Sequence, residues 1–188
     1  MFIQTEATPN PLTLKFLPGR IVLPSGTLEL RDPESAAKSP LARALFAISG
    51  VSTVFFGSDF VSVSKGENDE WQHLRPAILG AIMEHYVSGA PLLEEGAPVP
   101  DGDDADEFFA PEDADTVATI KELLETRIRP AVAGDGGDIT FRGFRDGVVY
   151  LAMKGACAGC PSSTATLKSG IQNLLKHFLP DVQAVEQV

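Results

Sequence analysis

Cys157 and Cys160 are the residues whose type and spacing could do chemistry in this chain. Two intervening residues let both sulfur atoms of a Cys-x-x-Cys loop point at one centre, and Gly159 has no Cβ to obstruct the tight turn. Pro161 suits the first position of a helix, whose free amides and positive dipole end would lie near the thiols. Thiolates are therefore expected to be favoured here. The loop could serve a zinc ion, an iron-sulfur cluster or a redox disulfide.

The number of ligands restricts these alternatives. Structural zinc and ordinary clusters take four protein ligands, and one chain supplies only Cys157 and Cys160. His177, the only histidine after the loop, is interpreted as a residue of a helix end, and His73 and His85 as structural. A two-fold pair of chains would supply four cysteines most simply. A dithiol oxidoreductase fits less well, because its motif belongs in a βαβ pattern. On the residues alone, cluster, zinc and redox chemistry all stay open.

The elements around the loop predict a small α+β domain over residues 114–188. The helical pattern that starts near Val117 should stop at Arg129-Pro130, because the residue before proline disfavours the α region. The glycine-rich stretch after it follows a helix and lacks the Lys-Ser/Thr of a phosphate loop, so it should be a helix cap and turn. The predicted elements are a helix over 117–128, a turn over 134–138, strands over 139–144 and 148–153, a helix over 161–178 and a strand over 182–188. The buried faces of the two helices are predicted to be Val117, Ile120, Leu123, Leu124 and Ile128, and Leu167, Ile171, Leu174, Leu175 and Phe178.

Residues 1–88 predict a second α+β domain. Its predicted elements are strands over 2–7, 12–17 and 26–30, a helix over 40–48, a hairpin over 51–56 and 60–64, and a helix over 71–86. The buried face of the last helix is predicted to be Trp71, Leu74, Ile78, Leu79, Ile82 and Tyr86. The fold class is therefore two small α+β domains joined by a linker.

The linker over residues 89–113 is acidic and contains proline. It carries nine of the acidic side chains and no Lys, Arg or His, so it accounts for most of the formal net charge of -11. Like charges and prolines favour an extended, flexible chain, and the domains should tumble partly independently. Phe108 and Phe109 are interpreted as an incidental apolar pair at the edge of the next helix, with docking on a domain or a partner as the alternative. Neither domain is basic enough for a nucleic-acid partner, and no apolar run approaches the roughly 18 residues of a membrane span.

Several segments resemble a known family. Ile128-Arg129-Pro130 and residues 135–139, 155–164 and 166–171 are similar to the C-terminal NifU (Nfu) domain. Residues 1–6, 8–11, 14–16 and 18–19 are similar to the N-terminal domain of bacterial and mitochondrial Nfu proteins. Together the two resemblances cover nearly all of the chain except the linker.

The resemblance implies a non-enzymatic scaffold or carrier that binds a [4Fe-4S] cluster between two protomers. By position, Cys157 and Cys160 match the family's cluster and metal ligands, and no catalytic residue is expected. The implied partners are a second copy of the chain, apo iron-sulfur client proteins and upstream cluster assembly proteins. The first domain is expected to recognise clients or to have a structural role. A dithiol-disulfide oxidoreductase is the alternative, and the start at Met1 without a leader predicts a bacterial, cytoplasmic protein.

Overall fold

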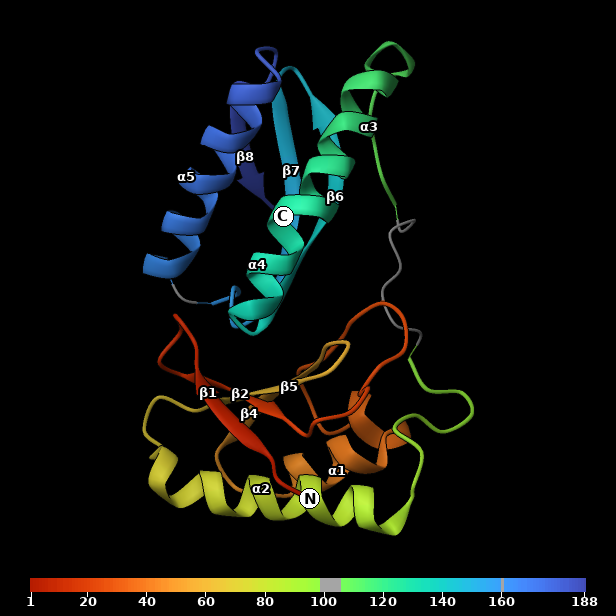
Figure 1. Ribbon diagram of the computed structural model, residues 1–188, viewed down its shortest axis with the longest axis vertical. Helices are drawn as coiled ribbons and strands as arrows, with labels where there is room; N and C mark the ends of the chain where they lie inside the picture. Colours follow the sequence, from red (N-terminus) through yellow and green to blue (C-terminus); the bar gives the residue numbers. More distant parts are fainter. Residues whose placement is uncertain (99–105, 160) are drawn as a thin grey trace.

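The computed structural model describes residues 1–98, 106–159 and 161–188, and for residues 161–163 the backbone only. Figure 1 shows two α+β units, one built on the first half of the chain and one on the second. This arrangement confirms the predicted fold class. No helix in the described part of the chain combines the length and the apolar character needed to cross a membrane. The expected flexibility of residues 89–113 stays a prediction, since residues 99–105 lie outside the described part.

The N-terminal domain is one antiparallel sheet with helices on one face (Figure 1). Its strands are β1 (Gln4–Ala7), β2 (Thr13–Leu17), β3 (Leu28–Leu30), β4 (Val51–Phe56) and β5 (Val61–Lys65), in the order β1-β2-β5-β4-β3. Its helices are η1 (Ser35–Lys38), α1 (Pro40–Phe46) and α2 (Trp71–Ser88). Of the predicted apolar face of α2, Leu74, Ile78 and Ile82 are buried in the core, and Trp71, Leu79 and Tyr86 are partly buried against it. His85 is buried, which agrees with a structural role, whereas His73 is exposed.

The other face of this sheet carries one row of side chains that runs across four strands. Lys15 on β2 lies directly opposite Ser62 on β5, Ser62 lies opposite Phe55 on β4, and Phe55 lies opposite Glu29 on β3. Side chains alternate between the two faces of a strand, so the row points away from the core residues Val61 and Val63. This row faces the C-terminal domain.

The C-terminal domain has a three-stranded sheet in the order β6-β7-β8. The strands are β6 (Gly137–Arg145), β7 (Val148–Gly155) and β8 (Ala184–Gln187), with β6 antiparallel and β8 parallel to β7. The helical elements are η2 (Pro111–Asp113), α3 (Ala114–Leu123), η3 (Leu124–Ile128), α4 (Arg129–Gly134) and α5 (Pro161–Phe178). Strand β7 ends at Gly155 and α5 begins at Pro161, so the cysteine loop joins the sheet to its longest helix.

The helix that was predicted to stop at Arg129-Pro130 continues to Gly134. The chain passes through a π-helical turn, η3, between α3 and α4. Pro130 then falls at the second position of α4, where its missing N–H is not needed to hold that segment together. The prediction was wrong because the wider turn allows proline where a regular α-helix would break.

The buried face of the first helix was predicted correctly, whereas the predicted face of α5 is buried only in part. Leu167 and Leu174 of α5 are partly buried. All five predicted residues of the first helix are buried, and Ile171 and Leu175 of α5 are buried with them. Phe178 is 45% exposed, contrary to the prediction, and the Arg127 guanidinium lies 5.2 Å from the centre of its ring. The ring therefore ends the helix at the surface instead of in the core.

Phe108 docks on the C-terminal sheet, so the interpretation of an incidental pair is wrong for this residue. Its N–H donates to the Arg142 carbonyl at 3.1 Å, and its own carbonyl accepts from the Phe144 N–H at 2.9 Å, along the edge of β6. Its ring centre lies 5.2 Å from that of Tyr150. A Cβ on Gly143 would come within 2.3 Å of the ring, so Gly143 provides the space that the ring occupies.

Replacing Phe108 by Ala should destabilise the C-terminal domain by about 2 kcal/mol, because the half-buried ring and its aromatic contact are lost. Phe109 is 40% exposed, so Phe109→Ala is the matched control and should cost less than about 0.5 kcal/mol. Chemical denaturation of the two variants and the parent chain measures both differences. Equal effects of the two changes would contradict a specific role for Phe108.

Candidate functional site

The loop between β7 and α5 is shaped by glycine and by hydrogen bonds of its own. Gly155 and Gly159 have φ angles of 65° and 81°, which residues with a side chain rarely adopt. The Ala158 N–H donates to the Gly155 carbonyl at 3.1 Å, and the Thr164 hydroxyl donates to the Cys157 carbonyl at 3.0 Å. The first turn of α5 thus holds the loop at Cys157. The second predicted ligand, Cys160, lies outside the described residues.

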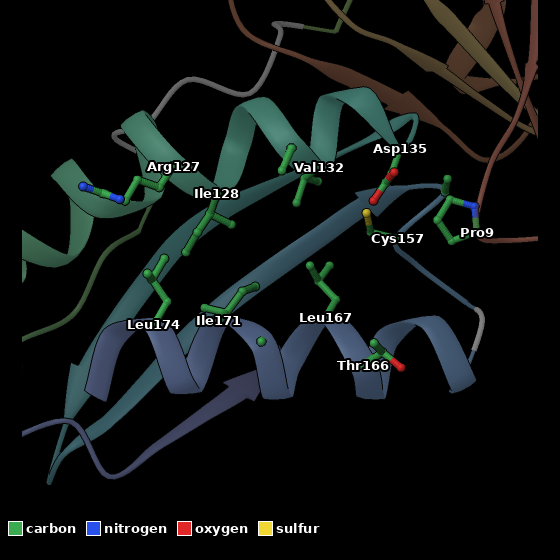
Figure 2. Close-up of a pocket in the computed structure, with 13 residues that line it drawn as sticks. Pro9, Arg127, Ile128, Val132, Asp135, Cys157, Thr166, Leu167, Ile171 and Leu174 are labelled. Carbon is green, nitrogen blue, oxygen red and sulfur yellow. The ribbon is translucent and has the colours of Figure 1, made fainter. Parts of the chain in front are cut away.

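Cys157 is buried at one end of a groove in the C-terminal domain. Figure 2 shows the groove between α4 and α5, above the sheet, with Cys157, Asp135 and Pro9 at the same end. Its cavity volume is about 550 Å³. The lining is mostly apolar and includes Ile128, Val132, Leu167, Ile171 and Leu174. A Cβ on Gly137 would lie 2.7 Å from the Cys157 sulfur, so that glycine leaves room for the thiol.

Burial, together with the negative charges of Asp135 and Asp138, raises the pKa of the Cys157 thiol to about 12. The prediction that a thiolate is favoured at this loop is therefore wrong for Cys157. The carboxylates and the apolar surroundings outweigh the helix start at Pro161, since a thiolate would lose water and meet two like charges. A dithiol oxidoreductase needs at least one thiol with a lowered pKa, and Cys157 does not provide it. A metal ligand can release its proton on binding.

Asp138 is a buried carboxylate held by several donors. Its Oδ1 accepts from Arg129 Nε at 3.0 Å and from the Ile139 N–H at 2.8 Å. Its Oδ2 accepts from Arg129 Nη2 at 3.1 Å and from the Thr27 hydroxyl of the N-terminal domain at 2.9 Å. The carboxylate therefore joins α4, β6 and the other domain close to the cysteine loop.

Sequence reasoning did not assign Asp135, Asp138 or Pro9 to the site. The two aspartates lie in a segment that was predicted as a turn and noted for its resemblance. Pro9, which also lies in a segment noted for its resemblance, reaches the groove from the other domain. In the described part of the chain, no group of three or more His, Cys, Asp and Glu side chains could hold a metal ion. His177 is exposed and contacts the Phe178 ring, which agrees with a residue of the helix end.

A cysteine pair on a glycine loop, in a domain without a further group of metal ligands among its described residues, is compatible with a protein that binds a metal ion or a cluster through thiolates. Two family models match the chain: the N-terminal scaffold domain of Nfu/NifU over residues 3–89, and the NifU-like domain over residues 120–186. The human mitochondrial NFU1 iron-sulfur cluster scaffold homolog is 52% identical over the whole chain, which covers 72% of that protein. The mitochondrial NifU-like protein 4 of Arabidopsis thaliana is 51% identical over the whole chain, which covers 66% of its length.

The chain therefore belongs to the Nfu family of iron-sulfur cluster scaffold proteins, and the resemblance noted in its motifs is confirmed. A solution structure of a NifU-like protein from Saccharomyces cerevisiae aligns with 50% of this chain and 86% of its own, with a TM-score of 0.46 and 24% identity.

The prediction of a bacterial, cytoplasmic protein is contradicted by the relatives. Those that match the whole chain at about half identity are named as mitochondrial proteins. The chain spans only about two thirds of the length of the fly and plant relatives, so its first residue gives no information about a leader.

Proposed function

We propose that the chain carries a [4Fe-4S] cluster between two copies of itself and passes it to apo-proteins without catalysing a reaction of its own. The cluster is the cargo of this process. Cys157 and Cys160 of each copy would be its four ligands. The transfer partners would be apo iron-sulfur client proteins, with upstream assembly proteins as the source.

The observation that carries this proposal is the number of thiols. The chain has two cysteines, and its described residues offer no other group of metal ligands. A [4Fe-4S] cluster takes four cysteine thiolates, so a single chain would leave half of the iron without a protein ligand. A closed two-fold pair supplies the missing two ligands with the same residues.

The environment of Cys157 supports a carrier rather than an enzyme. A thiol with a pKa near 12 is neutral and unreactive in the metal-free chain at neutral pH. Binding of iron would displace the proton of this thiol. Because burial of the loop sets the pKa of the thiol, loading and release of the cluster would depend on the position of the loop. Because the sulfur lies inside the groove, the loop would have to turn outward to share a cluster with a second copy.

Anaerobic reconstitution with iron and sulfide should give about two iron and two sulfide per chain, in a species that contains two chains. Native mass spectrometry measures the mass of that species, and elemental analysis counts iron, sulfide and zinc. A cluster-bearing single chain without added thiol would contradict the bridging site. Zinc bound at one ion per two chains, in place of iron, would instead favour a zinc site.

A further inference from the structure

The row Lys15, Ser62, Phe55 and Glu29 on the N-terminal sheet meets the C-terminal domain at two glycine loops. Lys15 Nζ donates to the Gly134 carbonyl at 3.2 Å, and the Ser62 hydroxyl donates to the Gly136 carbonyl at 2.7 Å. Glu29 Oε2 accepts from the Gly155 N–H at 2.6 Å. All three polar members of the row thus bind main-chain atoms.

The glycines allow the two surfaces to approach closely. A Cβ on Gly136 would lie 3.0 Å from the Ser62 hydroxyl oxygen, and a Cβ on Gly155 would lie 3.2 Å from the Phe55 ring. Phe55 and Ser62 are each 1% exposed, although neither belongs to the hydrophobic core of the N-terminal domain. The C-terminal domain therefore shields this face from water.

The contact also removes two charged side chains from water. The side chains of Lys15 and Glu29 are each 8% exposed. Glu29 accepts a charge-assisted hydrogen bond from the Gly155 N–H, in addition to its 2.6 Å ion pair with Arg31 of its own domain. Burial of a charge is costly unless such partners are present. The main-chain groups of the glycine loops provide partners for the two buried charges of the row.

The same contact covers the ligand loop. Asn10 Nδ2 donates to the Ala158 carbonyl at 3.4 Å, and Pro9 lies at the Cys157 end of the groove. Cys157 is only 6% exposed in this arrangement. A second copy of the chain could not approach the loop from the side that Asn10 and Glu29 occupy.

We propose that this sheet face is a docking surface for the chain's own glycine loops, residues 134–137 and 155–159, and that docking closes the metal-free chain. The closed chain and the two-chain cluster site then compete for the same loop. The competition rests on the proposed function, whereas the docking itself does not. Only the open fraction of chains is competent to form the cluster site, so the apparent affinity for cluster falls by that fraction.

Ser62→Lys tests the docking, because a long side chain on this face would meet Gly136 while Val61 and Val63 keep the domain core. Asn68→Lys is the matched control, since it adds the same charge at an exposed position. In the metal-free full chain, Ser62→Lys should enlarge the radius of gyration in X-ray scattering and speed hydrogen exchange of the Gly155 amide by about tenfold or more. The control should change neither quantity. Unchanged exchange and size in a folded Ser62→Lys protein would overturn the docking.

Glu29→Ala is a second variant that leaves the strand pattern intact, with the exposed Glu67→Ala as its control. It should speed exchange at Gly155 in the same direction, because the charged acceptor is lost. Both docking variants should then take up iron and sulfide faster than the parent and the controls. At limiting iron, they should also form more of the two-chain species than the parent and the controls do. Faster exchange with unchanged uptake would overturn the competition and leave the docking. Absence of a cluster in every protein, parent included, would refute the proposed function and the competition with it, while the exchange data would still decide the docking.

Discussion

Replacing Cys157 or Cys160 by Ser is expected to abolish stable cluster binding. A serine hydroxyl is a hard, protonated donor at neutral pH and is a poor substitute for a thiolate on iron. Two of the four ligands disappear at once, because the same change occurs in both copies. The visible absorption of the reconstituted protein should fall to the level of a sample without iron, and the two-chain species should vanish from native mass spectra.

The fold should survive these changes, since the apolar faces of α3 and α5 hold the C-terminal domain together. Cys157 is buried, so Cys157→Ala provides a variant that removes the ligand without placing a hydroxyl in the groove. Ala158→Ser is the matched control in the same loop and should keep the cluster. A charge-transfer band that survives in both Cys157→Ser and Cys160→Ser would disprove the ligand assignment.

Replacing Arg129 by Met should destabilise the C-terminal domain by about 3 kcal/mol. The change removes two hydrogen bonds to Asp138, the 2.8 Å ion pair with Glu125, and the charge that compensates Asp138, whose side chain is only 6% exposed. A buried ion that loses its partner costs more than the pair contributes when intact. Urea denaturation followed by a signal from the C-terminal domain measures the loss.

Arg127→Met is the matched control, because Arg127 is exposed and its guanidinium lies 5.2 Å from the centre of the Phe178 ring. It should cost less than about 1 kcal/mol. Arg129→Lys should fall between the two, since lysine keeps the charge and loses the planar fork that binds both carboxylate oxygens. If Arg129→Met cost no more than Arg127→Met, Thr27 and the Ile139 amide would suffice to hold Asp138.

The sequence was sufficient for features that depend on local spacing. Helix α2 and the buried face of α3 follow from apolar residues that recur every three or four positions, and the turn at Gly136 follows from a helix end. The cysteine loop was found because two cysteines at this short spacing indicate metal, cluster or redox chemistry. Each of these features depends on residues that are neighbours in the chain.

The features that were missed depend on residues far apart in the chain. Nothing near Cys157 in the sequence indicates that Asp138 and the groove raise the pKa of its thiol. Phe108 docks because Gly143, 35 positions later, leaves space for its ring. The π-helical turn before Pro130 is a local feature. A helix so often ends before proline that the pattern favoured a helix end at Arg129-Pro130 instead of at Gly134.

The N-terminal sheet binds the two glycine loops through their main-chain atoms. This kind of contact affects which residues of the two domains can change between relatives. A carbonyl or an amide offers the same hydrogen bond whatever side chain stands beside it. The loops can therefore change most of their side chains without a compensating change on the sheet, whereas Gly136 and Gly155 are constrained by both their φ angles and the close approach of the sheet. An N-terminal domain taken from a relative that keeps Lys15, Ser62 and Glu29 should fit this C-terminal domain, so chimeras between relatives should fold with their halves in contact.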